Sequence, residues 1–235
     1  KIHSYYYFDA ETGAAVTNQF VNWKGNWYYF GNDGKALLFD QVINGQHLYF
    51  DANGRQVKGG FVTNTDGSRS FYHWNTGDKL VSTFFTTGHD RWYYADDKGN
   101  VVTGAQVING QKLFFATDGK QVKGDFATNA NGSRSYYHGA TGNKLVSTFF
   151  TTGDNNWYYA DAKGELVVGE QTINGQNLYF DQTGKQVKGA TAANPDGSIS
   201  YYDVHTGEKA INRWVKIPSG QWVYFNAQGK GYVSN

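Results

Sequence analysis

Three sets of side chains that could bind a sugar recur along the chain. A sugar ring has apolar C–H faces that pack on aromatic rings, and its hydroxyls need amide or ammonium groups as hydrogen-bond partners. Each set has an aromatic ring, a glutamine seven residues after it, a lysine nine residues after it and a second glutamine eight residues before it. The sets lie 65 residues apart and are Tyr49, Gln56, Lys58 and Gln41; Phe114, Gln121, Lys123 and Gln106; and Tyr179, Gln186, Lys188 and Gln171.

Residues that catalyse reactions or bind metals show no comparable pattern. The four glutamates (Glu11, Glu165, Glu170 and Glu208) are scattered, and the aspartates stand mostly in turns, where Asp is favoured because its side chain bonds the turn backbone. A glycoside hydrolase needs two carboxylates at a fixed separation, and no such pair is marked. The chain has no cysteine, which excludes thiolate chemistry and disulfides. We expect a segment that is not an enzyme and has no catalytic residues, metal ligands or cofactor.

Charge and hydropathy exclude two further classes of partner. The net charge is +1 and no basic run exceeds two residues, so we expect neither nucleic acid nor an anionic membrane surface as a partner. The longest apolar stretches are about strand length, too short to span a bilayer. The chain contains no Met, even at position 1, which suggests an excerpt of a longer or processed chain. We expect a monomer.

The whole chain repeats with the same period of 65 residues. Segments of the WYY type begin at Trp27, Trp92, Trp157 and Trp222. A period this strict is typical of an array of like units that bury their faces against their neighbours. Such arrays usually bind ligands. The sequence predicts one elongated repeat domain over residues 1–235, built of 65-residue blocks with three hairpins each.

A smaller pattern within each block predicts the hairpins. An aromatic residue stands five positions before each of eleven turn glycines, and the position three after is nearly always aliphatic. An aromatic run, a D-x-x-G turn and a second short strand are typical of a β-hairpin. One hairpin alone is marginally stable in water. The prediction is therefore an all-β fold, a β-solenoid of about eleven short stacked hairpins, with turn glycines at 13, 34, 54, 77, 99, 119, 142, 164, 184, 207 and 229.

The faces of one hairpin illustrate how the predicted site would form. With residues 48–50 paired against 55–57, Tyr49 lies opposite Gln56 and Leu48 lies opposite Val57. Side chains alternate between faces along a strand. We therefore expect Leu48 on the packed face, and Tyr49, Gln56 and Lys58 together on the other.

These motifs resemble those of a known family. WYYF-x-x-x-G, INGQ-x-LYF-D-x-x-G and GKQVKG in alternation resemble the YG-type repeats of the glucan-binding domains of glucansucrases, the streptococcal and lactic-acid-bacterial glucosyltransferases and dextransucrases. The resemblance covers essentially the whole chain. It implies a secreted, extracellular β-solenoid, in some cases associated with the cell wall, that flanks a catalytic domain. It also implies that α-glucans such as dextran, or isomalto-oligosaccharides, bind in pockets between hairpins, with Tyr49 stacked on a glucosyl unit and Gln56 and Lys58 bonded to its hydroxyls.

Other functions stay open at this point. Related hairpin repeats occur in choline-binding modules, and a choline- or teichoic-acid-binding cell-wall anchor is the main alternative. Choline needs a cage of aromatic rings, usually with a Gly-Trp before the next WYY segment, where this chain has Phe84-Phe85 and Phe149-Phe150. A purely structural spacer is another alternative. An enzyme would need a catalytic domain outside these residues.

Overall fold

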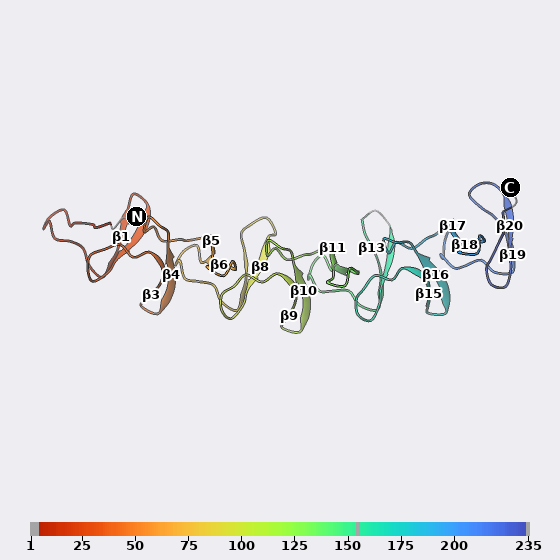
Figure 1. Ribbon diagram of the computed structural model, residues 1–235, viewed down its shortest axis with the longest axis horizontal. Coiled ribbons are helices and arrows are strands. Elements are labelled where there is room, and N and C mark those ends of the chain that lie inside the picture. Colours follow the sequence, from red (N-terminus) through yellow and green to blue (C-terminus); the bar gives the residue numbers. More distant parts are fainter. Residues whose placement is uncertain (1–4, 154–155, 234–235) are drawn as a thin grey trace. The chain divides into compact units, whose positions relative to one another are not determined.

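The described residues, 5–153 and 156–233, form strands and turns and contain no helix. They are seen in a computed structural model (Figure 1). They divide into two compact units, which are described separately here. Unit 1 comprises the described part of 1–106 together with 115–121, and unit 2 comprises 107–114 together with the described part of 122–235. The prediction of a single domain over 1–235 stays a prediction.

Twenty strands form ten two-stranded antiparallel hairpins in the described residues, and each odd-numbered strand pairs with the strand that follows it. Residues 19–95 hold β1 (Gln19–Trp23), β2 (Asn26–Phe30), β3 (Phe39–Ile43), β4 (Gln46–Phe50), β5 (Gly60–Thr63), β6 (Arg69–Tyr72), β7 (Thr83–Thr86) and β8 (Trp92–Ala95). Residues 104–160 hold β9 (Gly104–Ile108), β10 (Gln111–Phe115), β11 (Asp125–Thr128), β12 (Arg134–Tyr137), β13 (Thr148–Thr151) and β14 (Trp157–Ala160). Residues 169–225 hold β15 (Gly169–Ile173), β16 (Gln176–Phe180), β17 (Ala190–Ala193), β18 (Ile199–Tyr202), β19 (Arg213–Lys216) and β20 (Trp222–Phe225).

The all-β fold of successive hairpins is confirmed. Ten two-stranded sheets are present in the described chain, and the segments on either side of the turn glycines are joined by single bridges, such as Phe8 opposite Ala15 around Gly13. The Asn-Gly pairs account for the tightest hairpins. Asn44 and Gly45 join β3 to β4 with φ of 51° and 81°, the conformation that a two-residue type I′ turn requires and that Asn-Gly adopts at low cost.

The predicted pairing within each hairpin is wrong in one respect. The aromatic strand β4 pairs with the strand before it, so that Tyr49 lies opposite Asp40. The segment after the D-x-x-G turn makes one bridge, and its partner is Phe50 opposite Gln56, not Tyr49 opposite Gln56. The same shift brings Phe115 opposite Gln121 and Phe180 opposite Gln186.

A backbone hydrogen bond accounts for this register, since the copy at Phe115 has the same register with Ala116 in place of Asp51. The Asp51 N–H donates to the Arg55 carbonyl at 2.8 Å, and the Ala116 N–H donates to the Lys120 carbonyl at 2.8 Å. Arg55 is thereby drawn into the loop, which becomes one residue longer than the four predicted. A shift of one residue moves every side chain beyond the turn to the other face of the strand.

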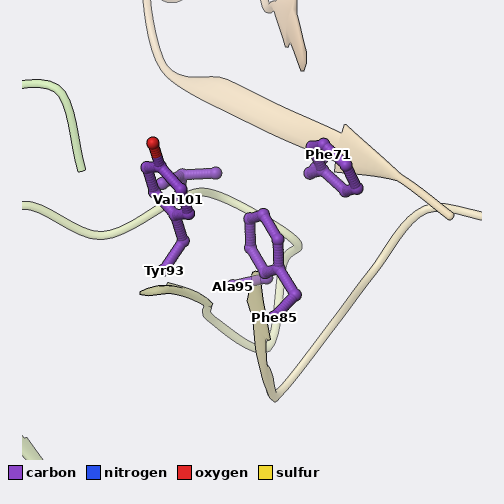
Figure 2. Packing of buried hydrophobic residues seen from close by; sticks show 5 residues of the cluster. All are labelled: Phe71, Phe85, Tyr93, Ala95 and Val101. Carbon is purple, nitrogen blue, oxygen red and sulfur yellow. The ribbon is translucent and has the colours of Figure 1, made fainter. Parts of the chain in front are cut away.

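The buried face of the hairpins is as predicted. Leu48 and Phe50 are 1% and 0% exposed, while Tyr49 between them is half-buried. In unit 1 the rings of Phe71, Phe85 and Tyr93 stack in sequence, with centroids 4.6 and 5.3 Å apart (Figure 2). Ring stacking within and between hairpins thus forms much of the core in this part of the chain.

Candidate functional site

The aromatic member of each predicted set packs against a buried tyrosine of the following hairpin. The ring centroids of Tyr49 and Tyr72 are 5.8 Å apart, and the Tyr72 hydroxyl donates a hydrogen bond to Asp40 Oδ1 at 3.0 Å. Burial, with smaller contributions from Asp40 and Asp51, raises the pKa of Tyr49. The same packing recurs for Phe114 with Tyr137 at 5.7 Å and for Tyr179 with Tyr202 at 5.5 Å. Each ring is therefore fixed on one side and half-buried.

The glutamine and lysine after the ring bond the turn that follows the next hairpin. Gln56 Nε2 donates to the Thr76 carbonyl at 3.1 Å, and Lys58 Nζ donates to the Asn75 carbonyl at 3.0 Å. In unit 2, Gln186 donates to Thr206 at 3.5 Å and Lys188 to His205 at 3.4 Å. These bonds fix the direction of the side chains. An ammonium has three N–H donors and an amide also has an acceptor oxygen, so further hydrogen-bonding capacity remains at both groups.

The structure brings a tryptophan to these polar groups. Lys58 Nζ lies 5.3 Å from the centre of the Trp27 ring, and the Gln56 N–H donates to the Trp27 carbonyl at 2.8 Å. In unit 2, Lys188 Nζ lies 5.3 Å from the Trp157 ring, and the Gln186 N–H donates to the Trp157 carbonyl at 2.7 Å. We call Trp27, Gln56 and Lys58, and their copies Trp157, Gln186 and Lys188, the Trp–Gln–Lys clusters.

These tryptophans are not among the binding residues that the sequence predicts. Trp27 is 39% exposed and Trp157 37%, while the next residues, Tyr28 and Tyr158, are 8% and 7% exposed. Alternation along the strand would have placed the tryptophans on the open face. They lie about 30 positions from the polar residues along the chain, so local spacing did not indicate that they come together.

The remaining predicted residues have mainly local partners. The side-chain amides of Gln41, Gln106 and Gln171 each donate to a backbone carbonyl three residues earlier, at 2.7, 2.8 and 2.8 Å. Gln121 is 6% exposed and its N–H donates to the Trp92 carbonyl at 2.7 Å. Lys123 is half-buried. Ligand contact by any of the twelve residues in the three predicted sets stays a prediction.

An aromatic cavity of about 560 Å³ lies near the start of unit 1. Rings from residues 5–8 and from β1 and β2 line it, together with the side chains of Asn53 and Arg55. At its edge, Trp23 is 47% exposed and Lys24 Nζ lies 4.6 Å from the centre of the Trp23 ring. The cavity thus combines apolar ring faces with an amide and a guanidinium group.

The described residues show neither a metal-binding group nor a membrane-spanning helix. Residues 5–153 and 156–233 contain no group of three or more His, Cys, Asp or Glu side chains placed to hold a metal ion. None of the described segments is a helix long and apolar enough to cross a membrane.

Two models of repeat families match the chain. The choline-binding repeat matches residues 41–84, 102–149 and 167–214. A cell wall binding repeat matches residues 18–36, 82–101, 147–166 and 212–230. Together they follow the block structure along most of the sequence.

The predicted resemblance to glucosyltransferases is confirmed by relatives. Glucosyltransferase-S of Streptococcus mutans serotype c is 42% identical over 95% of this chain, and Glucosyltransferase-I of Streptococcus downei is 37% identical over 92% of it. The chain spans 15% and 17% of the lengths of these two relatives.

Solved structures share the fold. Choline binding protein F from Streptococcus pneumoniae matches with a TM-score of 0.65 at 20% identity, over 97% of this chain and 89% of that one. The modular autolysin LytC from the same organism matches with a TM-score of 0.64 at 17% identity, over 97% of this chain and 52% of that one. These likenesses support the stacked-hairpin fold.

Proposed function

We propose that this chain, which belongs to the choline-binding repeat family, binds α-glucan polymers as a non-catalytic module of a longer, secreted glucosyltransferase. The similarity to two streptococcal glucosyltransferases supports the choice of glucan, since it extends over more than nine-tenths of the chain. A module that binds glucan would keep the polymer close to an enzyme that transfers glucosyl units. The cell wall binding repeat model supports a location outside the cell, in contact with the wall.

The observation that carries the proposal is the repeated Trp–Gln–Lys cluster. A glucosyl unit has apolar faces for the exposed part of the Trp27 ring, and hydroxyls for the Gln56 amide and the Lys58 ammonium. Both polar side chains are already held by backbone carbonyls of the next turn, so binding costs little of their rotamer freedom. Unit 2 has the same arrangement at Trp157, which supports a function served in several copies.

The other predicted residues complete the proposed binding surface. The half-buried rings of Tyr49, Phe114 and Tyr179 are proposed as further stacking platforms, each braced by a buried tyrosine. Gln41, Gln106, Gln121, Lys123 and Gln171 are proposed to contribute further hydroxyl partners. Because these sites are separate, several weak contacts along one polymer would add up to firm binding.

Choline is the second candidate, and the family match favours it. A quaternary ammonium binds in a cage of ring faces because of the negative potential over each ring. In this chain, Lys24, Lys58 and Lys188 already lie over tryptophan rings, and the Arg55 guanidinium lines the aromatic cavity. These cations repel another cation, and a neutral sugar is not repelled. The charge distribution therefore favours glucan.

The test is to substitute the clustered tryptophans. Trp27→Ala and Trp157→Ala should each weaken the binding of isomaltotriose about 2- to 13-fold at the altered cluster, because an aromatic contact contributes roughly 0.5–1.5 kcal/mol. Trp222→Ala is the matched control, since Trp222 has the same place in the repeat, is 64% exposed and precedes no copy of the Gln and Lys pair within the given sequence. Calorimetric titration with isomaltotriose and with choline would measure both ligands. Binding of choline alone would refute the glucan proposal.

A further inference from the structure

A polar cavity in unit 2 was not predicted as a site. Its volume is about 320 Å³, and the polar side chains that line it are those of Glu170, Gln171, Thr172, Asn177, Lys209 and Gln228. Gln171 is the one member that also belongs to a predicted set. The cavity has room for about ten water molecules at roughly 30 Å³ each, which is enough for a single sugar ring. No aromatic ring lines it.

Hydrogen bonds hold the polar groups of this cavity in place. Glu170 Oε1 accepts a hydrogen bond from the Tyr202 hydroxyl at 3.0 Å and forms an ion pair with Lys209 Nζ. The Lys209 side chain is only 12% exposed. Across β15 and β16, Thr172 Oγ1 donates to Asn177 Oδ1 at 2.8 Å. Groups fixed before a ligand arrives lose little freedom when it binds.

The charges in the cavity cancel. The Lys209 ammonium lowers the pKa of Glu170 by hydrogen bonding, so the carboxylate stays ionised and the pair is neutral overall. The other four side chains carry hydroxyl or amide groups. An ion pair surrounded by uncharged donors and acceptors suits an uncharged ligand that offers several hydroxyl groups.

The earlier repeats show that the hairpin scaffold does not require this composition. Where the cavity has Thr172, Asn177 and Gln228, the residues 65 positions earlier are Val107, Lys112 and Lys163. The residues 130 positions earlier are Val42, His47 and Lys98. Both earlier copies therefore have an apolar residue and basic residues at positions that are neutral and hydrogen-bonding in the cavity. The same hairpin forms around either composition, so folding does not account for the polar residues of the cavity.

We propose that this cavity binds one uncharged sugar unit through its hydroxyls alone, as a site additional to the Trp–Gln–Lys clusters. The ligand class rests on the proposed function, since α-glucan is the polymer of neutral sugars that the chain is proposed to bind. The Glu170 carboxylate accepts hydrogen bonds from adjacent hydroxyls of the sugar. The Lys209 ammonium and the amides of Asn177 and Gln228 donate to the sugar oxygens.

Nuclear magnetic resonance of the whole chain with isomaltotriose tests this site directly. The side-chain NH₂ signals of Asn177 and Gln228 should shift as the trisaccharide is added, and should still shift in a Trp27→Ala, Trp157→Ala double variant. The variant T172V/N177K/Q228K has the residues of the preceding repeat. In it, isomaltotriose should no longer move the backbone signals around Glu170 but should still move those around Trp27. Gln228→Lys alone, at an exposed turn position, is the second variant, and it should weaken the site at least several-fold with the melting temperature unchanged.

The outcomes separate the two proposals. If isomaltotriose shifts signals around Trp27 but leaves Asn177 and Gln228 unmoved, this cavity is not a sugar site and the proposed function stands. Equal shifts around Glu170 in wild type and T172V/N177K/Q228K would also overturn the inference. If isomaltotriose moves no signal anywhere in the wild-type chain, the proposed function itself fails.

Discussion

At the scale of single residues, three equivalent tyrosines offer an internal comparison. Tyr72, Tyr137 and Tyr202 are 0%, 1% and 1% exposed. The hydroxyls of Tyr72 and Tyr202 donate to Asp40 and Glu170, but the sequence has Ala105 at the corresponding position of the middle block. Tyr72→Phe should therefore reduce the free energy of unfolding by about 1 kcal/mol, and Tyr137→Phe by less. Urea unfolding of the two variants measures this, and an equal loss would contradict the role assigned to the carboxylate.

The same tyrosines make stability sensitive to alkaline pH. Burial first, and then the neighbouring carboxylate, raises the pKa of Tyr72 and of Tyr202 well above the usual value of 10.0. The unfolded chain loses these protons near pH 10 and the folded chain keeps them. Stability is therefore complete below about pH 10 and falls as the pH rises beyond it. In melts at increasing pH, Tyr202→Phe should show a shallower decline than wild type, and an identical slope would contradict the assignment.

Two tyrosines of different hairpins, one in the core and one half-buried, should separate folding from binding. Tyr28 lies in the core of unit 1 with Phe30 and is 8% exposed, whereas Tyr49 is half-buried. Tyr28→Ala should cost roughly 3–5 kcal/mol of folding stability. Tyr49→Ala should mainly reduce the binding of dextran, which is measured as slower migration of the protein in dextran-containing gels. If Tyr49→Ala melted as early as Tyr28→Ala and its folded fraction bound dextran normally, Tyr49 would have no binding role.

At the scale of elements, the contacts between successive hairpins depend on glycines in their turns. Gly77 has φ +74°, and a Cβ there would lie 2.3 Å from Gln56 Nε2, in the amide that holds this turn. Gly67 has φ +83°, and a Cβ there would meet no neighbouring atom within 4 Å. Gly67→Ala should cost about 1–2 kcal/mol for its backbone conformation, and Gly77→Ala should cost about 1–3 kcal/mol more. Thermal melts compare the stability of the two variants. Equal losses of stability would show that displacing the Gln56 amide from this turn costs nothing.

The elements also show how far the sequence alone could predict this molecule. The period of 65 residues and the alternation of faces identified the hairpins and placed Leu48 in the core, because both depend on local spacing. The register of Gln56 was missed because the Asp51 N–H bonds the Arg55 carbonyl, which makes the turn one residue longer than the D-x-x-G pattern indicates. The Trp–Gln–Lys clusters were missed because Trp27 and Lys58 lie on different hairpins, and a contact between hairpins has no local signature.

At the scale of the whole molecule, repetition should convert weak sites into firm binding of a polymer. The clusters at Trp27 and Trp157 are similar and separate, and linked sites typically gain about 10²–10⁴-fold over one site. Long dextran should therefore bind far more tightly than isomaltotriose. Isothermal titration of both ligands measures the ratio. Equal affinity for the two would show that a single site does the binding.

The nature of the polymer is the central claim, and retention on cross-linked dextran tests it most directly. The whole chain should be retained at both low and high salt, because an uncharged ligand leaves little electrostatic attraction for salt to screen. It should elute with isomalto-oligosaccharide and not with choline. A chain that passes through the dextran resin, or that leaves it when choline or salt is added, would contradict the account.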